Sequence, residues 1–107
     1  MHSRHRLLLC TCPDPETAQA LAERLVDERL AACVNILPGI RSVYRWEDAV
    51  QQDSETLLLV KTGAERVSEL IERLRELHPY EVPEIIALPI TEGLSDYLSW
   101  VDACTSS

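Results

Sequence analysis

The order of hydrophobic patterns along the sequence is the feature that most strongly constrains the fold of this chain. Short apolar segments alternate with segments in which apolar residues recur every three or four positions, the spacing of a helix with one buried face. Strands are predicted over residues 6–12, 32–46, 55–62 and 84–90, and helices over about residues 15–30, 64–78 and 95–104. The order β-α-β-β-α-β with a short C-terminal helix is that of an α+β, ferredoxin-like domain, with an antiparallel sheet and both main helices on one face.

Individual residues mark where these elements begin, bend and end. Asp14 is expected to cap the first helix, with Pro15 at its first position. The pair Pro38-Gly39 predicts a bulge within one long strand, and the polar residues 47–53 predict a hairpin loop. Residues 78–84 contain two prolines, which predict that the second helix ends near residue 78 and that an extended connection follows.

Composition narrows the class of protein. A chain of 107 residues that is 46% hydrophobic is expected to form one domain over residues 1–107, with residues 1–5 as a flexible tail. The net charge of −8 repels phosphate backbones and anionic lipids, so neither nucleic acid nor membrane is expected as a partner. The apolar run behind the basic N-terminus is too short for a signal sequence or a membrane span. A cytoplasmic location is expected, where the four cysteines would remain thiols.

The predicted strands are apolar on both faces. Leu57 and Leu59 point to one face of the sheet, and Leu58 and Val60 point to the other, yet two helices can cover only one face. Each such side chain left in water would forfeit ~1.5–3 kcal/mol, so self-association is expected to cover the second face. The core is predicted from the following residues, or from their neighbours one position along: Leu9, Leu21, Leu25, Leu57, Leu59, Leu70, Leu74 and Ile86.

Several motifs, taken together, resemble the CutA family of divalent-cation-tolerance proteins. They are Cys-Thr-Cys-Pro-Asp at residues 10–14, Leu-Ala-Ala-Cys-Val-Asn-Ile at 30–36, Tyr44 with Trp46, Lys61-Thr62, His-Pro-Tyr at 78–80 with Pro83-Glu84, and Asp-Tyr-Leu-Ser-Trp at 96–100. The resemblance implies a ferredoxin-like subunit in a tight homotrimer, binding of copper and of other divalent cations such as zinc, and a role in metal-ion tolerance or response. Trimers of this kind are similar to the PII-type signalling proteins. The alternative is therefore a signalling or scaffold trimer that binds a small molecule or a protein partner, with metal binding incidental.

The same resemblance implies a metal site at Cys10 and His78, with Glu84 as a nearby acid. A thiolate and an imidazole suit copper or zinc, and a carboxylate can complete the set of ligands. Leu77 stands where some relatives carry a second histidine, whereas Cys12 offers a further soft ligand. Two simpler interpretations stay open: Cys10 as a small buried hydrophobe, and His78 as a cation at the end of a helix dipole.

Two further expectations concern the location and the chemistry of this site. From the crossover connections we expect residues 78–84 beside the amino end of the first strand, near Arg6. A site that uses both Cys10 and His78 would then either form across a subunit boundary, with Cys10 from a neighbouring chain, or not form at all. Metal could instead bind the histidines of the N-terminal tail, His2 and His5. No enzymatic activity is expected, because the sequence contains no nucleophile elbow, phosphate-binding loop or dinucleotide fingerprint, and nothing marks an oxyanion hole beside a Cys10–His78 pair.

Overall fold

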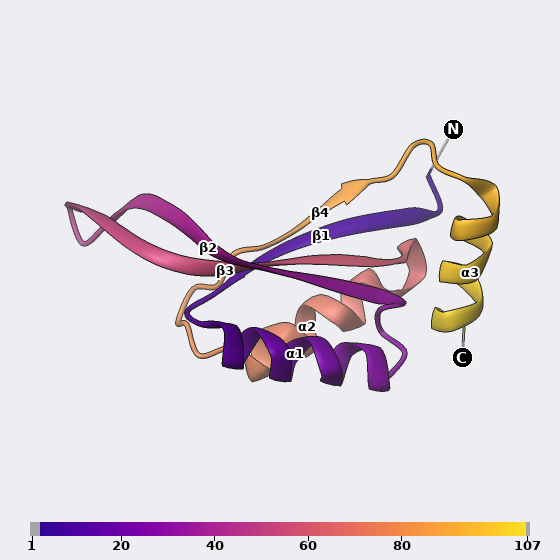
Figure 1. The fold of residues 1–107 in the computed structure, drawn as a ribbon, viewed down its shortest axis with the longest axis horizontal. Helices are drawn as coiled ribbons and strands as arrows, with labels where there is room; N and C mark the ends of the chain where they lie inside the picture. The colour runs from indigo at the N-terminus through magenta and orange to yellow at the C-terminus, as the bar shows by residue number, and fades with distance from the viewer. Residues whose placement is uncertain (1–2, 107) are drawn as a thin grey trace.

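The architecture is an antiparallel sheet covered on one face by two helices (Figure 1). The structure is a computed structural model that describes residues 3–106. Within these residues, the four strands lie in the order β2-β3-β1-β4, and all neighbouring strands are antiparallel. The α+β, ferredoxin-like prediction is confirmed, with the proline-containing β4 at an edge of the sheet. The elements are β1 (His5–Cys12), α1 (Pro15–Asp27), β2 (Cys33–Trp46), β3 (Ala49–Gly63), a short 3-10 turn (Ala64–Arg66), α2 (Val67–Leu77), β4 (Ile85–Pro89) and α3 (Ser95–Thr105).

Helix α1 begins as the sequence predicts and ends sooner. The Asp14 carboxylate accepts a hydrogen bond from the Thr17 backbone N–H at 2.7 Å, and Pro15 occupies the first turn. The helix ends at Asp27 because Arg29 adopts a left-handed conformation with φ of 61°. The Leu30 N–H then returns to the Leu25 carbonyl at 2.9 Å, which turns the chain toward β2.

Strands β2 and β3 form a long hairpin that projects beyond the helices (Figure 1). The predicted bulge is present, since the strand register shifts between Leu37 and Ile40. The predicted loop over residues 47–53 is wrong: Ala49 already pairs with Trp46, and the turn consists of two left-handed residues between them. The polar residues after the turn remain in β3 because this part of the hairpin is exposed, where polar side chains are compatible with a strand.

The core lies between the sheet and the two helices. The predicted helix positions Leu21, Leu25, Leu70 and Leu74 are buried. On the strands, the buried face belongs to the neighbours of the predicted residues, because a strand that is apolar on both faces does not reveal which one the helices cover. The buried strand residues are Leu8, Cys10, Cys12, Leu58 and Val60, whereas Leu9, Leu57 and Leu59 are partly exposed and Ile86 is exposed.

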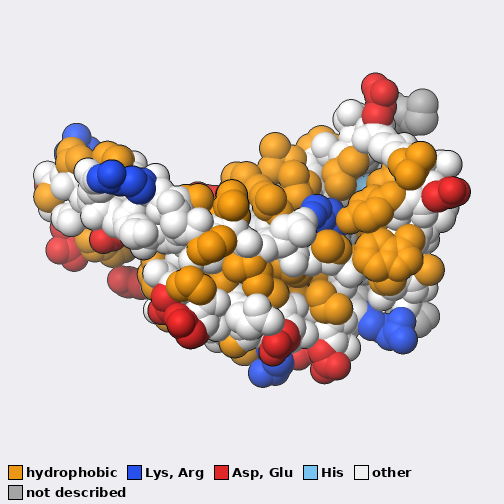
Figure 2. All heavy atoms as spheres, viewed as in Figure 1, with side chains coloured by type: hydrophobic (Ala, Val, Ile, Leu, Met, Phe, Trp, Pro, Cys, Tyr) orange, Lys and Arg blue, Asp and Glu red, His pale blue; other side chains and the backbone are white. Residues whose placement is uncertain are grey.

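The second face of the sheet is apolar and uncovered. Leu9 lies opposite both Leu59 on β3 and Ile86 on β4, so these side chains share that face. Ile86 is 49% exposed and Leu88 is 41% exposed. Figure 2 shows hydrophobic side chains gathered where β1 and β4 lie in Figure 1. We call the face formed by Leu7, Leu9, Leu57, Leu59, Ile86 and Leu88 the open face.

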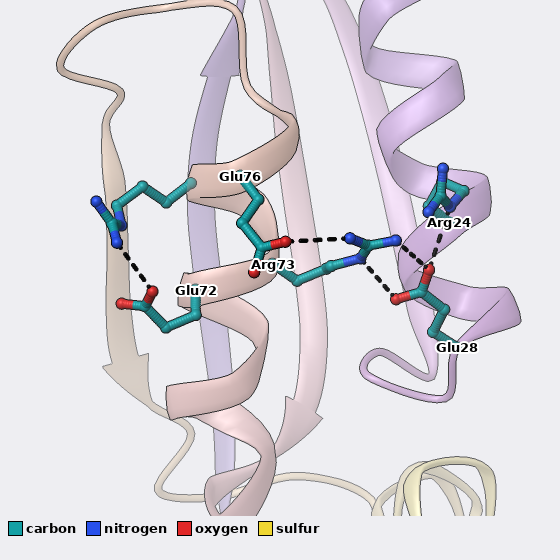
Figure 3. Close-up of polar contacts among 6 residues, drawn as sticks. Arg24, Glu28, Glu72, Arg73 and Glu76 are labelled. Carbon is teal, nitrogen blue, oxygen red and sulfur yellow. Dashed lines mark hydrogen bonds and ion pairs between the residues drawn. The ribbon is translucent and has the colours of Figure 1, made fainter.

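An arginine joins the two helices (Figure 3). Arg73 on α2 donates from Nε and Nη2 to the two carboxylate oxygens of Glu28, each at 2.8 Å, and from Nη1 to Glu76 at 3.3 Å. The spacing of Glu69 and Arg73 predicts a pair within α2, but Glu69 instead pairs with Arg66 at 3.2 Å. Arg73 faces α1, and the bidentate contact with Glu28 is the stronger geometry.

Residues 3–5, which we expected within a flexible tail, are held to the domain. Ser3 Oγ donates to the His5 carbonyl oxygen at 3.1 Å, and the Arg4 carbonyl oxygen accepts from the Ala64 N–H at 2.8 Å. The His5 ring belongs to β1, is 9% exposed and contacts the Asp102 carboxylate of α3 at 2.9 Å. His5 is therefore engaged within the fold, while residues 1 and 2, including His2, lie outside the described residues.

Candidate metal centre

The carboxyl end of β1 directs two thiols into the core. Cys10 and Cys12 are two positions apart on a strand, so their side chains point to the same face. That face is covered by the helices, and both cysteines are 0% exposed. Thr11 lies between them and points to the other face. The spacing of Cys10 and Cys12 in the sequence already predicted that both side chains share one face of the strand. The resemblance, in contrast, named only Cys10 of the two as a metal ligand.

A histidine approaches this pair from the end of α2. His78 is the C-cap residue, and its backbone is extended (φ −74°, ψ 137°), as expected for a residue before proline. Its ring is buried, with Nε2 2.7 Å from the Thr11 carbonyl oxygen and Nδ1 3.1 Å from the Tyr80 backbone nitrogen. A carbonyl can only accept and an N–H can only donate, so the ring is the neutral tautomer with its proton on Nε2.

The three side chains form one cluster within a single chain. One ligand atom from each of Cys10, Cys12 and His78 lies within 4.8 Å of the other two. The expectation that residues 78–84 meet the amino end of β1, with the cysteine coming from another chain, is therefore wrong. The reason is topological: β4 is antiparallel to β1, so its first residue, Ile85, lies opposite Cys10 near the carboxyl end of β1.

The two thiols influence one another. Interaction with the Cys12 thiol, followed by burial, raises the pKa of the Cys10 thiol, and the negative charges of Cys12 and Glu84 add to this effect. The Cys10 S–H, acting as donor, lowers the pKa of Cys12 against the opposing effect of burial. Two charged sulfurs side by side are therefore disfavoured.

The remaining predicted ligand lies outside this cluster. Glu84 is exposed immediately before β4. It lies close enough to Cys10 for its negative charge to raise the pKa of that thiol. Leu77, the residue before His78, packs against the hydrophobic core. The donor atoms that the fold does bring together are two sulfurs and one imidazole nitrogen, a set that suits soft metal ions.

The segment that follows His78 also lines a surface pocket. Its volume is about 570 Å³, and its lining includes Tyr44, Trp46, Glu55, Tyr80 and Glu84. The Tyr80 hydroxyl donates to Oε2 of Glu55 at 2.5 Å, and Glu55 is only 8% exposed. Tyr44 and Trp46, which belong to the motifs of the resemblance, are exposed in the single chain and line this pocket.

Among residues 3–106, none of the helices combines the length and the apolar character needed to cross a membrane.

Comparison with known proteins places the chain in a family. Residues 6–104 match the family model described as CutA1 divalent ion tolerance protein. The chain is 55% identical over 95 residues to the divalent-cation tolerance protein CutA of Thermus thermophilus, covering 89% of this chain and 92% of that protein. It is 46% identical over 97 residues to protein CutA of Mus musculus, covering 91% of this chain and 55% of that longer protein.

Solved structures agree with the sequence comparison. The CutA crystal structure from Xylella fastidiosa matches with a TM-score of 0.95 at 44% identity, over 97% of this chain and 100% of that one. The Thermus thermophilus divalent cation tolerance protein matches with a TM-score of 0.92 at 52% identity, over 95% of this chain and 99% of that one. The chain belongs to the CutA1 divalent ion tolerance protein family.

Proposed function

We propose that this chain binds copper, and other divalent cations such as zinc, through Cys10 and His78 with Glu84 nearby, and thereby contributes to metal-ion tolerance or response. The observation that carries the proposal is the meeting of a buried thiol and a buried imidazole within one chain. The relatives' names, which refer to divalent-cation tolerance, support the same role.

Ligation by His78 has a modest energetic cost. Both ring nitrogens already form hydrogen bonds, so binding a metal replaces one of them. A hydrogen bond of this kind contributes about 0.5–1.5 kcal/mol, whereas sulfur and nitrogen ligands bind zinc in small domains with about 10–16 kcal/mol. The existing contacts therefore position the imidazole without preventing ligation.

Binding is favoured over catalysis. A cysteine nucleophile needs a neighbouring base whose ring nitrogen is available to take the thiol proton. In His78, Nδ1 accepts a hydrogen bond from the Tyr80 backbone N–H, and the Nε2–H donates a hydrogen bond to the Thr11 carbonyl oxygen. We therefore propose a non-enzymatic role for the Cys10–His78 pair.

The homotrimer and the cytoplasmic location are parts of this proposal. The open face supports self-association, because its apolar side chains lie uncovered in one subunit. The thiols of Cys10 and Cys12 support a reducing compartment. One structural relative, from Archaeoglobus fulgidus, is described as a periplasmic divalent cation tolerance protein, so subcellular fractionation of the native organism is the test of location.

The function is tested by copper titration of the reduced protein without oxygen. We expect saturable uptake of about one ion per chain, with Cys10→Ser and His78→Ala each reducing it. Cys33→Ser is the matched control, because Cys33 lies outside the cluster. Affinity should fall at acidic pH, where protons compete for the ligands. Unchanged binding in the Cys10→Ser/His78→Ala double variant would contradict the proposal, and His2→Ala would then test the N-terminal histidine.

The surface pocket favours a second candidate function, the binding of a small molecule in a PII-like signalling or scaffold trimer. Aromatic rings and carboxylates together suit an organic cation. Screening small organic amines by thermal shift tests this candidate. Stabilisation that is lost in Trp46→Ala would support it, and absence of any stabilising amine would count against it.

A further inference from the structure

We propose that the ion held at this site is copper(I), and that Cys12, in place of Glu84, is its third protein ligand. The proposal rests on the proposed function, because it assumes that metal binds at Cys10 and His78. It adds the identity of the third ligand and the oxidation state of the ion.

The position of Cys12 supports its assignment as the third ligand. Its side chain is on the same face of β1 as that of Cys10, is equally buried at 0% exposed, and belongs to the group of ligand atoms within 4.8 Å of one another. Two metal–sulfur bonds of ~2.3 Å span at most ~4.6 Å, so one ion fits between the sulfurs with little or no movement of the strand. Glu84 is exposed at the surface and is absent from this group.

The number and type of the ligands support the assignment of the ion as copper(I). Two thiols are soft ligands that favour copper(I), and an imidazole also suits copper. Zinc is almost always four-coordinate in structural sites or takes a water beside three protein ligands, and among the described residues no further His, Cys, Asp or Glu joins the three. Copper(I) is stable with fewer ligands and needs no solvent molecule in this buried space.

The binding step is a ligand exchange without electron transfer. Copper(I) arrives as a complex with a weak carrier ligand, which it releases. The coordinating thiols give their protons to solvent as the copper–sulfur bonds form. The His78 ring remains neutral and exchanges one of its hydrogen bonds for the metal bond.

The experiment is an anaerobic competition for copper(I), supplied as its acetonitrile complex, between the full chain and the chelator bathocuproine disulfonate. Variants Cys10→Ser, Cys12→Ser, Cys12→Ala, Glu84→Gln and the control Cys33→Ser are compared, and circular dichroism checks that each is folded. X-ray absorption at the copper edge counts the sulfur ligands. Zinc(II) at tenfold excess tests the preference for copper(I).

We expect two sulfur ligands in the native chain and one in Cys12→Ser, with affinity reduced at least tenfold in both Cys12 variants. Glu84→Gln and Cys33→Ser should change affinity less than threefold, and zinc should not displace copper. The inference is overturned if both Cys12 variants keep native affinity, if one sulfur is counted in the native chain, or if zinc displaces the copper. Should Cys10→Ser weaken binding while Cys12→Ser does not, the proposed function survives without this inference. Native affinity in every variant contradicts both.

Discussion

The imidazole Nε2 of His78 lies 2.7 Å from the backbone carbonyl oxygen of Thr11. This contact joins the end of α2 to the end of β1, although the two residues are far apart in the sequence. The same ring accepts from the Tyr80 N–H, so one side chain orders both the exit from α2 and the start of the following segment. Ordering the ring in this way also holds it beside the two thiols.

Replacing His78 by alanine should destabilise the ion-free protein by about 1–3 kcal/mol, because a buried ring and its two hydrogen bonds are lost. His78→Asn is the matched variant: an asparagine side chain can accept from the N–H two residues on, so it should recover part of the loss. Urea unfolding at neutral pH measures both. Native stability in His78→Ala would show that the contacts are not needed to hold the segment.

The open face predicts self-association, and the resemblance to the CutA family makes a homotrimer the expected assembly. Light scattering at micromolar concentration should give a mass near three times that of the 12.1 kDa chain. Ile86→Asp should reduce this mass, because it places a charge on a face that another copy would cover. Val26→Asp is the control, since Val26 is 43% exposed on α1, away from the open face. A monomeric mass for the native chain, or dissociation by the control alone, would contradict the prediction.

Tyr80 predicts an alkaline loss of stability. Partial burial, followed by its hydrogen bond to Glu55, raises the pKa of the Tyr80 phenol. Since the folded pKa lies above that of the unfolded chain, the stabilisation is present below pH ~10 and is lost as pH rises beyond it. Tyr80→Phe should be less stable by about 1 kcal/mol at pH 7 and should lose less stability above pH ~10 than the native protein. Parallel alkaline profiles in urea unfolding would be the contrary result.

Glu28 predicts an acid loss of stability. The Arg73 hydrogen bonds lower the pKa of the Glu28 carboxyl, with a smaller contribution from Arg24. The folded pKa lies below that of the unfolded chain, so the stabilisation is present above pH ~4.3 and is lost as pH falls through the folded value. Glu28→Gln should therefore show a shallower decline in stability below pH ~4.5 than the native chain. Glu65→Gln, which alters an exposed acid outside the ion pairs of the described residues, should leave the slope unchanged.

The order of elements was predictable because hydrophobic periodicity and capping residues are local signals. Asp14 and the proline after His78 gave the start of one helix and the end of another correctly. The face of the sheet that is buried was not predictable from periodicity, since Leu57 and Leu58 are equally apolar and only the helices distinguish them. The two-residue hairpin turn was also missed, because left-handed Glu47 and Asp48 lack the glycine that usually signals such a turn.

The site was predictable only in part. The resemblance named Cys10 and His78, and the structure places them together. Their location within one chain depends on which end of β1 lies beside the start of β4, a relationship that strand pairing determines and local sequence does not. Cys12 joins them because the helices cover the face of β1 on which it lies. Hydrophobic periodicity could not predict which face of β1 the helices cover.

One chain is proposed to hold a metal ion at the carboxyl end of β1. Anomalous diffraction at the copper edge, from crystals grown without oxygen in the presence of copper(I), locates that ion. We expect one peak per chain, within bonding distance, ~2.3 Å, of Cys10 Sγ and flanked by Cys12 and His78 of the same chain. Peaks found only between chains, or only at the N-terminal histidines, would contradict it.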